Sequence, residues 1–262
     1  DDLVNNSIYI EGDSDGTFDT DDYILFHAWG PHRWSQNSDT TFNQDRNPYS
    51  DVSCYFININ SSQLPLRILP VSSTVVPATH SVSIYSYYDV HEIDAVNLLS
   101  GGQRWYGELF DTELQRVINI NVPNIDGSVP AYFEVSIASS ANTSSGTSHS
   151  YSVNGTSIGS FSLPVASDYA RQEMLMTLNS PPSNLPLLIS VNRDAPSTLT
   201  YLDRILLNAR RQLVFVGTQI NFRDLNSIGV GNVSEFTVQN LPSSQGFVWE
   251  ITDRHQPFAV EG

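Results

Sequence analysis

Short runs in which apolar and polar residues alternate fill most of the chain. In such runs every second side chain can face a core, which is the pattern of a half-buried β-strand. β-Branched and aromatic residues dominate the runs, and Gly, Pro, Asn and Ser bound them. The pattern predicts strands over residues 7–10, 22–29, 53–60, 64–71, 80–90, 114–122, 131–140, 148–155, 186–193, 211–223, 234–241 and 246–252.

Helical periodicity is confined to two segments, residues 168–175 and 197–209. In the second segment the apolar residues fit a helical stripe, but they also fit a strand that contains one bulge, and we interpret it as mostly strand. Short strands at this spacing, with little helix, are typical of antiparallel sandwiches and jelly rolls. The sequence therefore predicts an all-β fold, a jelly-roll-like antiparallel β-sandwich built as two packed β units.

Paired glycines within residues 98–110 interrupt the chain between two β-rich halves. Trp105 in this stretch is expected to be buried between the halves, because its large ring would fix the angle between them. The Ser- and Thr-rich stretch 138–150 is expected to form an exposed hairpin loop, and the strand near 247–251 is expected to return to the first unit. The expected division is a β unit over 1–100, a hinge over 101–110, a second β-sandwich over 111–245, and a final strand and linker over 246–262.

Charge and composition exclude several classes of function. The 262 residues carry 28 acids against 12 bases, which gives a net charge of −16, and all the bases are arginine. Without lysine there is no Schiff-base or Walker-type lysine here. The acidic balance argues against nucleic-acid binding, which depends on clustered positive charge. No apolar run approaches the ~20 residues of a membrane helix. Without an initiator Met or a signal-peptide pattern, the chain is expected to be a mature protein or a piece of one.

Cys54 is the only cysteine of the chain. It lies in an apolar run, so we expect it to be a small buried residue of a strand rather than a nucleophile. The nucleophile motif G-x-S-x-G and the zinc motif H-E-x-x-H are both absent, and residues 91–94 (HEID) lack the second histidine. The sequence therefore predicts no catalytic residue in this segment.

Aromatic residues gather in the segment 26–56, around a Gly-Pro turn. Exposed Trp and Tyr rings on a β-sandwich can stack on sugar rings, with neighbouring polar side chains as hydrogen-bond partners. The alternative is that the rings close the edge of the sandwich, since aromatic residues more often bury area than display it. The candidate binding residues of this aromatic loop, which spans residues 29–49, are Trp29, His32, Trp34 and Tyr49.

An acidic stretch, residues 11–22, has the spacing of a calcium loop. Oxygen-bearing side chains stand at the first, third, fifth, seventh, ninth and twelfth places, and Gly16 stands at the sixth. Asp at the last place is shorter than the usual Glu, and strands rather than helices flank the loop. A hydrogen-bonded turn whose charges are screened by water or a distant arginine is the alternative. The candidate ligands for calcium are Glu11, Asp13, Asp15, Thr17, Asp19 and Asp22.

Four ordered stretches resemble the region that precedes the peptidase domain in gingipain-type sortases of the type IX secretion system of Bacteroidetes. The first runs through D-G-T-F-D-T-D-D-Y-I-L-F, G-P-H-R-W, N-P-Y-S and the aromatic strand at 55–56, with His27 where the family usually has tyrosine. The others are S-G-G-Q-R-W-Y-G-E-L-F at 100–110, Y-L-D-R-I-L-L-N-A-R-R-Q-L at 201–213 and V-W-E-I-T-D at 248–253. The resemblance thus spans nearly the whole chain.

The resemblance implies a parent protein that is a cell-surface cysteine peptidase or transpeptidase acting on secreted cargo. Its catalytic His and Cys would lie in a domain after residue 262, so this segment would be a non-catalytic accessory scaffold. The implied partners are that downstream domain and secretion-system proteins or cargo, outside the cell and at the outer membrane, with no membrane insertion. A carbohydrate-binding sandwich that uses the aromatic loop is the alternative function.

Overall fold

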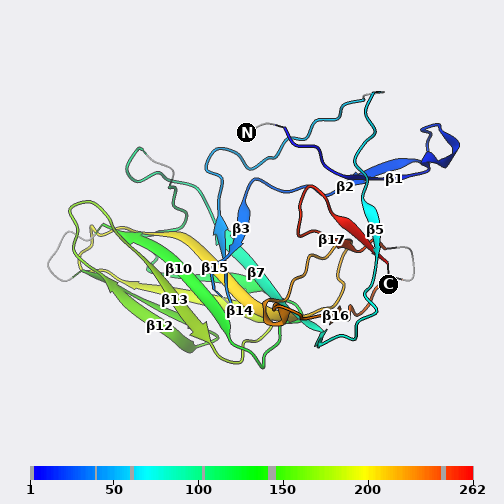
Figure 1. Cartoon of the computed structure of the whole chain (residues 1–262). Helices are drawn as coiled ribbons and strands as arrows, with labels where there is room; N and C mark the ends of the chain where they lie inside the picture. The colour runs from blue at the N-terminus through cyan, green and yellow to red at the C-terminus, as the bar shows by residue number, and fades with distance from the viewer. Residues whose placement is uncertain are drawn as a thin grey trace. The chain divides into compact units, whose positions relative to one another are not determined.

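A computed structural model describes residues 3–38, 40–59, 62–101, 104–140, 146–242 and 246–261 of the chain. The fold is all-β (Figure 1), and the helical residues within this described part are limited to two 3-10 turns, η1 (Asp13–Asp15) and η2 (Leu225–Ser227). No helix in these ranges is long and apolar enough to cross a membrane. The all-β prediction is confirmed.

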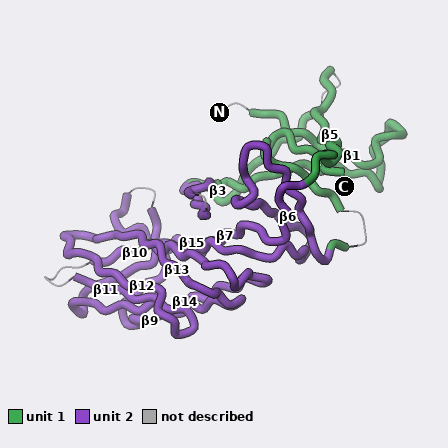
Figure 2. Tube along the Cα trace, turned by 60° about the horizontal axis from the view of Figure 1, so that its bottom comes forward, with its two compact units in different colours: residues 1–33, 49–77, 241–262 green, residues 34–48, 78–240 purple. Residues whose placement is uncertain are grey.

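The chain divides into two compact units, coloured separately in Figure 2. The C-terminal strands belong to the same unit as the N-terminal ones. The stretch 98–110 does not separate the units, because it lies inside unit 2, where it pairs with that unit's sheet; residues 102 and 103 of the expected hinge lie outside the described residues. Unit 1 comprises residues 1–33, 49–77 and 241–262, and unit 2 comprises residues 34–48 and 78–240.

Two antiparallel sheets build most of unit 2 (Figure 1). One sheet has the order β13–β10–β15–β7, with β8 also on β15, and the other has the order β12–β11–β14–β9. The strands of the first sheet are β7 (Ile84–Glu92), β8 (Leu109–Phe110), β10 (Ala131–Ser139), β13 (Ala170–Leu178) and β15 (Thr200–Gln212). Those of the second are β9 (Gln115–Asn121), β11 (Thr147–Val153), β12 (Thr156–Leu163) and β14 (Asn184–Asn192).

The hydrophobic core of unit 2 draws on both sheets. Alternate residues of β10 and β14 are fully buried in one cluster, since successive side chains of a strand point to opposite faces. Burial of each large apolar side chain contributes about 1.5–3 kcal/mol, so this cluster supplies most of the unit's stability. The pattern is that of a β-sandwich. Core residues from the two strands are Phe133, Val135, Ile137, Leu185, Leu187 and Ile189.

Smaller elements complete unit 2. The hairpin of β3 (Arg33–Gln36) and β4 (Phe42–Asp45) was not predicted from the sequence, and β6 (His80–Val82) pairs in parallel with β16 (Ser234–Phe236). The segment 168–175, a helical candidate by its periodicity, is strand β13 apart from its first two residues. The predicted strand 211–223 is wrong beyond Gln212, because the chain there turns away from the sheet into irregular structure.

Unit 1 contains two small sheets. β1 (Ile8–Glu11) and β2 (Tyr23–Phe26) form an antiparallel hairpin, and β5 (Leu69–Ser72) pairs in parallel with β18 (Phe258–Glu261), which also pairs with β17 (Trp249–Glu250). These strands are short, and all their residues are at least partly exposed.

Two sequence expectations in the segment 53–60 are wrong over its described part. Residues 53–59 form no strand, although their apolar and aromatic content is that of a strand, because no neighbouring strand of unit 1 pairs with them. Cys54 is exposed rather than buried for the same reason. Residue 60 lies outside the described ranges, as do residues 141–145 of the predicted hairpin loop at 138–150. Trp105 also differs from expectation, with 41% of its surface exposed.

Candidate functional site

The predicted aromatic loop is divided between the two units. Trp29, His32 and Tyr49 belong to unit 1, whereas Trp34 belongs to unit 2, and residue 39 lies outside the described part. The ring of Trp34 packs against Tyr88 of β7 at 4.2 Å between centroids. A half-buried ring that packs on its own sheet is not an open stacking platform, so the structure favours the edge-closing alternative at Trp34.

The aromatic residues of unit 1 have local packing partners as well. The hydroxyl of Tyr55 donates to the carbonyl of Trp29 at 2.9 Å and accepts from its N–H at 2.5 Å. The ring of Trp29 meets His27 edge-on at 5.1 Å, and burial lowers the pKa of that histidine. His32 lies 3.2 Å from a carboxylate oxygen of Asp51. Tyr49 is 81% exposed, so it displays most of its ring.

The acidic stretch forms the tip of the β1–β2 hairpin, and its carboxylates have separate partners. Asp13 pairs with Arg67, and Glu11 accepts from the Tyr9 hydroxyl. Asp15 accepts from the N–H and hydroxyl of Thr17 at 2.9 and 2.8 Å. The bond from the Thr17 N–H has the larger effect and the bond from its hydroxyl the smaller one, and together they hold the pKa of Asp15 below its usual range.

The C-terminal part of the same stretch is tied to its own backbone. Asp22 accepts from the Asp19 N–H at 2.8 Å, and Asp19 accepts from the Asp21 N–H at 3.2 Å. Across the described ranges, no three His, Cys, Asp or Glu side chains are arranged to hold a metal ion. The predicted calcium ligands therefore share one turn but do not converge.

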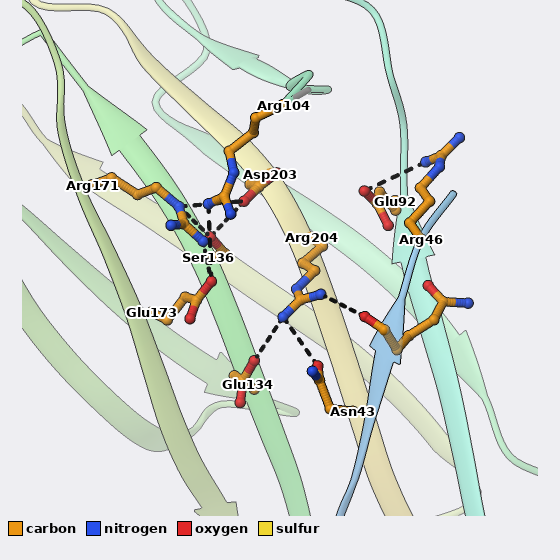
Figure 3. Close-up of polar contacts among 11 residues, drawn as sticks. Asn43, Arg46, Glu92, Arg104, Glu134, Ser136, Arg171, Glu173, Asp203 and Arg204 are labelled. Atoms are coloured by element: carbon orange, nitrogen blue, oxygen red, sulfur yellow. Dashed lines mark hydrogen bonds and ion pairs between the residues drawn. The ribbon is translucent and has the colours of Figure 1, made fainter. Parts of the chain in front are cut away.

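A dense group of charged and polar side chains gathers around strands β10 and β15 (Figure 3). We call it the Asp203 cluster; it consists of the residues that Figure 3 labels. On β10 its members Glu134 and Ser136 alternate with core residues, so they lie on the face that points away from the core. A bulge creates its centre: Ser136 pairs with Arg204 and Ile137 pairs with Leu202, so Asp203 is the extra residue of β15. Members of the cluster are Asn43, Arg46, Glu92, Arg104, Glu134, Ser136, Arg171, Glu173, Asp203 and Arg204.

Asp203 is a buried carboxylate held by several donors. The Ser136 hydroxyl donates to it at 2.7 Å, and Arg104 and Arg171 approach the same oxygen at 3.3 and 3.6 Å. Burial raises the pKa of Asp203, and the bond from Ser136 and the charge of Arg171 only partly offset that effect. Only 5% of Asp203 is exposed, so the carboxylate depends on these donors to replace water.

Arg204 joins the cluster to the β3–β4 hairpin. Its guanidinium donates to the Gln44 carbonyl at 3.1 Å, to the Asn43 side chain at 3.2 Å and to Glu134 at 3.3 Å. Arg46, at the end of the hairpin, pairs with Glu92 of β7 at 3.5 Å. Burial raises the pKa of Glu92, and the charge of Arg46 opposes that shift. These contacts fasten a hairpin from the start of the chain onto strands far along the sequence.

A further ion pair, between His91 and Glu108, holds the segment before β8 against β7. The Nε2 atom of His91 on β7 lies 2.6 Å from a carboxylate oxygen of Glu108. That bond raises the pKa of His91; burial would raise the pKa of Glu108, but the bond to His91 holds it below its usual range. The segment is also tight, since a Cβ on Gly107 would come within 2.8 Å of the Ile93 carbonyl oxygen.

The sequence analysis did not predict the polar residues that bind distant segments to the sheet. The signal that could have found them is a polar residue inside an apolar strand: Asp203, Asn208 and Arg210 interrupt a run that otherwise belongs in a core. Arg210 donates to Asp224 at 2.5 Å and to Ser86 at 2.7 Å. Chemically, the arrangement offers charge-assisted hydrogen bonds between distant segments.

Comparison with known proteins gives a match in fold. No protein-family model and no curated protein matches the sequence. Among solved structures, the dimeric latent PorU from Porphyromonas gingivalis matches all of this chain with a TM-score of 0.75 and 20% identity. The chain spans 24% of the length of that PorU chain. This chain therefore shares its fold with part of PorU, over its whole length.

Carbohydrate-binding modules also match, more weakly. A CBM36 module in complex with calcium and xylotriose covers 45% of this chain at 16% identity, and the match takes in 86% of that module. The match to the C-terminal CBM6 of LamC from Zobellia galactanivorans covers 47% of this chain and 91% of that module, at 13% identity. Their TM-scores of 0.28 and 0.24 are too low to carry an argument about this chain.

Proposed function

We propose that this chain is a non-catalytic accessory region of a gingipain-like cysteine peptidase, a sortase of the type IX secretion system. The observation that carries the proposal is the match in fold to PorU over the entire chain. The four ordered sequence motifs give independent support, because they come from the residues rather than from the fold.

The polar contacts between distant segments of unit 2 also support a scaffold role for the chain. One run, residues 201–213, supplies Asp203, Asn208 and Arg210, and each of the three binds a segment distant in sequence. Such bonds hold a hairpin and loops rigidly on a sandwich. In this role the chain positions the peptidase domain, secretion partners or cargo outside the cell, at the bacterial surface.

Catalysis by this segment has no support in the contacts of Cys54. The thiol is exposed, and no hydrogen bond in the described part of the chain joins it to a histidine, whereas cysteine nucleophiles act with a base within hydrogen-bond reach. The carbohydrate-binding alternative loses support at Trp34, whose ring packs on Tyr88. It retains Tyr49 as an exposed ring.

The test treats the segment and the downstream part of its gene separately. The 262-residue chain is incubated with denatured protein and basic-residue peptides beside its Cys54→Ala variant, and we expect no cleavage by either. The reading frame is then extended past Gly262, and the downstream part is co-expressed with the chain. Co-purification of the two parts, with peptidase activity in the downstream part, is the expected result. A reading frame without a peptidase domain, or turnover lost in Cys54→Ala, contradicts the proposal.

A further inference from the structure

Strand β2 forms the open edge of the β1–β2 hairpin. The N–H of Ile8 donates to the Leu66 carbonyl at 2.9 Å, and its carbonyl accepts from the Ile68 N–H at 2.9 Å. The backbone of Ile8 therefore points away from β2, and its partner Phe26 is in a non-hydrogen-bonded pair. Because pairs alternate along an antiparallel ladder, Ile24 is also non-bonded towards β1. The N–H and C=O groups of Ile24 and Phe26 thus face the open edge.

Nothing in the described part of the chain pairs with this edge. β2 has β1 as its one strand neighbour there, and no other backbone hydrogen bond reaches residues 23–26. Tyr23 and Ile24 are 40% and 44% exposed. Natural edge strands are usually protected by a charge, a proline or a bulge, and the sequence Tyr-Ile-Leu-Phe in regular register has none of these. The backbone groups of this edge are therefore available to hydrogen-bond with another strand.

The charge beside the edge defines what kind of strand fits. Asp19, Asp21 and Asp22 directly precede β2, and Glu11 stands opposite Tyr23 on β1. None of these four carboxylates has an ion pair with a described arginine, unlike Asp13, which Arg67 neutralises. The Tyr23 end of the edge is therefore negative, and a positive group on an incoming strand would be attracted to it.

We propose that β2 docks an extended strand of another protein, with apolar side chains at alternate positions and a lysine or arginine beside Tyr23. The incoming backbone bonds to Ile24 and Phe26, which adds a third strand to the hairpin. A second copy of this chain fits less well, because the residues that flank its own β2, 19–22 on one side and 27–32 on the other, include no lysine or arginine. The inference rests on the hairpin alone and does not depend on the proposed function.

The first experiment measures amide hydrogen exchange in the whole chain. The probe is a synthetic peptide of alternating valine and threonine with two lysines at each end, and its control has glutamates in place of the lysines. We expect the lysine peptide to protect the Ile24 and Phe26 amides, which exchange freely in the chain alone, whereas the Leu25 amide is protected throughout. The glutamate peptide should bind with about tenfold lower affinity, because it cannot form an ion pair with the carboxylates beside Tyr23.

Two variants separate the backbone contribution from the charge. Ile24→Pro removes an N–H that faces the open edge and leaves the ladder to β1 intact, so peptide affinity should fall about fivefold or more. Ile24→Val keeps the N–H and should retain affinity. Asp21→Asn, whose side chain has no described partner, should weaken the lysine peptide and not the glutamate peptide. The matched control is Asp168→Asn, an exposed position in unit 2 that should change neither.

Several results would overturn the inference. One is unchanged exchange at Ile24 and Phe26 in saturating lysine peptide, and another is equal binding of the two peptides. Retained affinity in both Ile24→Pro and Asp21→Asn would do the same. If the chain alone protects these amides and sediments at twice its mass, a second copy occupies the edge, and the assignment to a basic strand of another protein is wrong.

Discussion

The side-chain amide of Asn208 makes with Phe42 both hydrogen bonds that a neighbouring strand would make. Its oxygen accepts from the Phe42 N–H at 2.7 Å, and its nitrogen donates to the Phe42 carbonyl at 3.1 Å. Phe42 begins β4, whereas Asn208 stands well inside β15, 166 residues away. A single side chain therefore satisfies both backbone groups at the start of β4, a short strand outside the sheet that contains β15.

Replacing Asn208 with alanine should destabilise the chain. Asn208 and Phe42 are both about 4% exposed, so Asn208→Ala leaves a buried N–H and a buried C=O without partners. Such a loss costs about 1–3 kcal/mol per group. The measurement is the midpoint and slope of urea unfolding. Asn121→Ala, at an exposed position of β9, is the control, with an expected change within about 0.5 kcal/mol. Equal effects of the two variants would mean that the bonds to Phe42 contribute nothing.

His149 should make the chain sensitive to acid. It lies 1% exposed in the core beside Phe161, with no hydrogen-bond partner for either ring nitrogen among the described residues. Burial lowers the pKa of His149 to about 4. An unfolded histidine titrates near ~6.5, so between these values the unfolded chain binds the extra proton and stability falls as the pH falls. The loss attributable to this residue is about 3 kcal/mol.

The check is unfolding free energy at pH ~7 and at pH ~4.5, which lie on either side of the unfolded pKa. His149→Leu should lose less stability between the two than the unaltered chain does. His91→Gln is the matched control: Glu108 raises the pKa of His91, so that pair's contribution is present below pH ~6.5 and is lost as the pH rises through the raised value. His91→Gln should therefore keep the acid loss. An unchanged pH dependence in His149→Leu would contradict the assignment.

Trp105 and Phe110 should respond differently to truncation, although both are aromatic residues of one segment. Trp105 is 41% exposed, and Phe110 is fully buried in the unit 2 core. Phe110→Ala should cost about 3–5 kcal/mol, because it leaves a cavity. Trp105→Ala should cost about 1 kcal/mol or less, as a change near the surface does. The measurement is the free energy of unfolding of both variants in urea. Similar losses of stability would mean that Trp105 is buried, against the exposure stated above.

Calcium should leave the thermal stability unchanged. The carboxylates of Asp13 and Asp15 are occupied by Arg67 and Thr17, and the described part of the loop has no convergent set of oxygens to replace the water around the ion. The measurement is calorimetry of the chelator-treated chain with millimolar calcium, alongside Asp15→Asn. A melting shift in the original chain that is lost in Asp15→Asn would restore the calcium loop.

The sequence by itself determined the fold class and most long strands of unit 2. Alternation over residues 131–140 predicted β10 within one residue, because its two faces meet different surroundings, core on one side and polar side chains on the other. It also indicated that residues 197–209 are mostly a bulged strand. β15 (Thr200–Gln212) is such a strand, and its bulge lies at Asp203. Local patterns suffice where every second residue is buried.

Tertiary structure alone decided the pairings that cross the chain. Residues 53–59 are rich in apolar and aromatic side chains, as β10 is, yet no strand forms there, because a strand needs a partner and none lies beside it within the described part of unit 1. The division into units, each built from separated segments, results from pairings such as β5 with β18. Asp203 and Asn208 read as misplaced polar residues in the sequence. Their partners lie as far as 99 and 166 residues away, so only the folded chain brings these donors and acceptors within bonding distance.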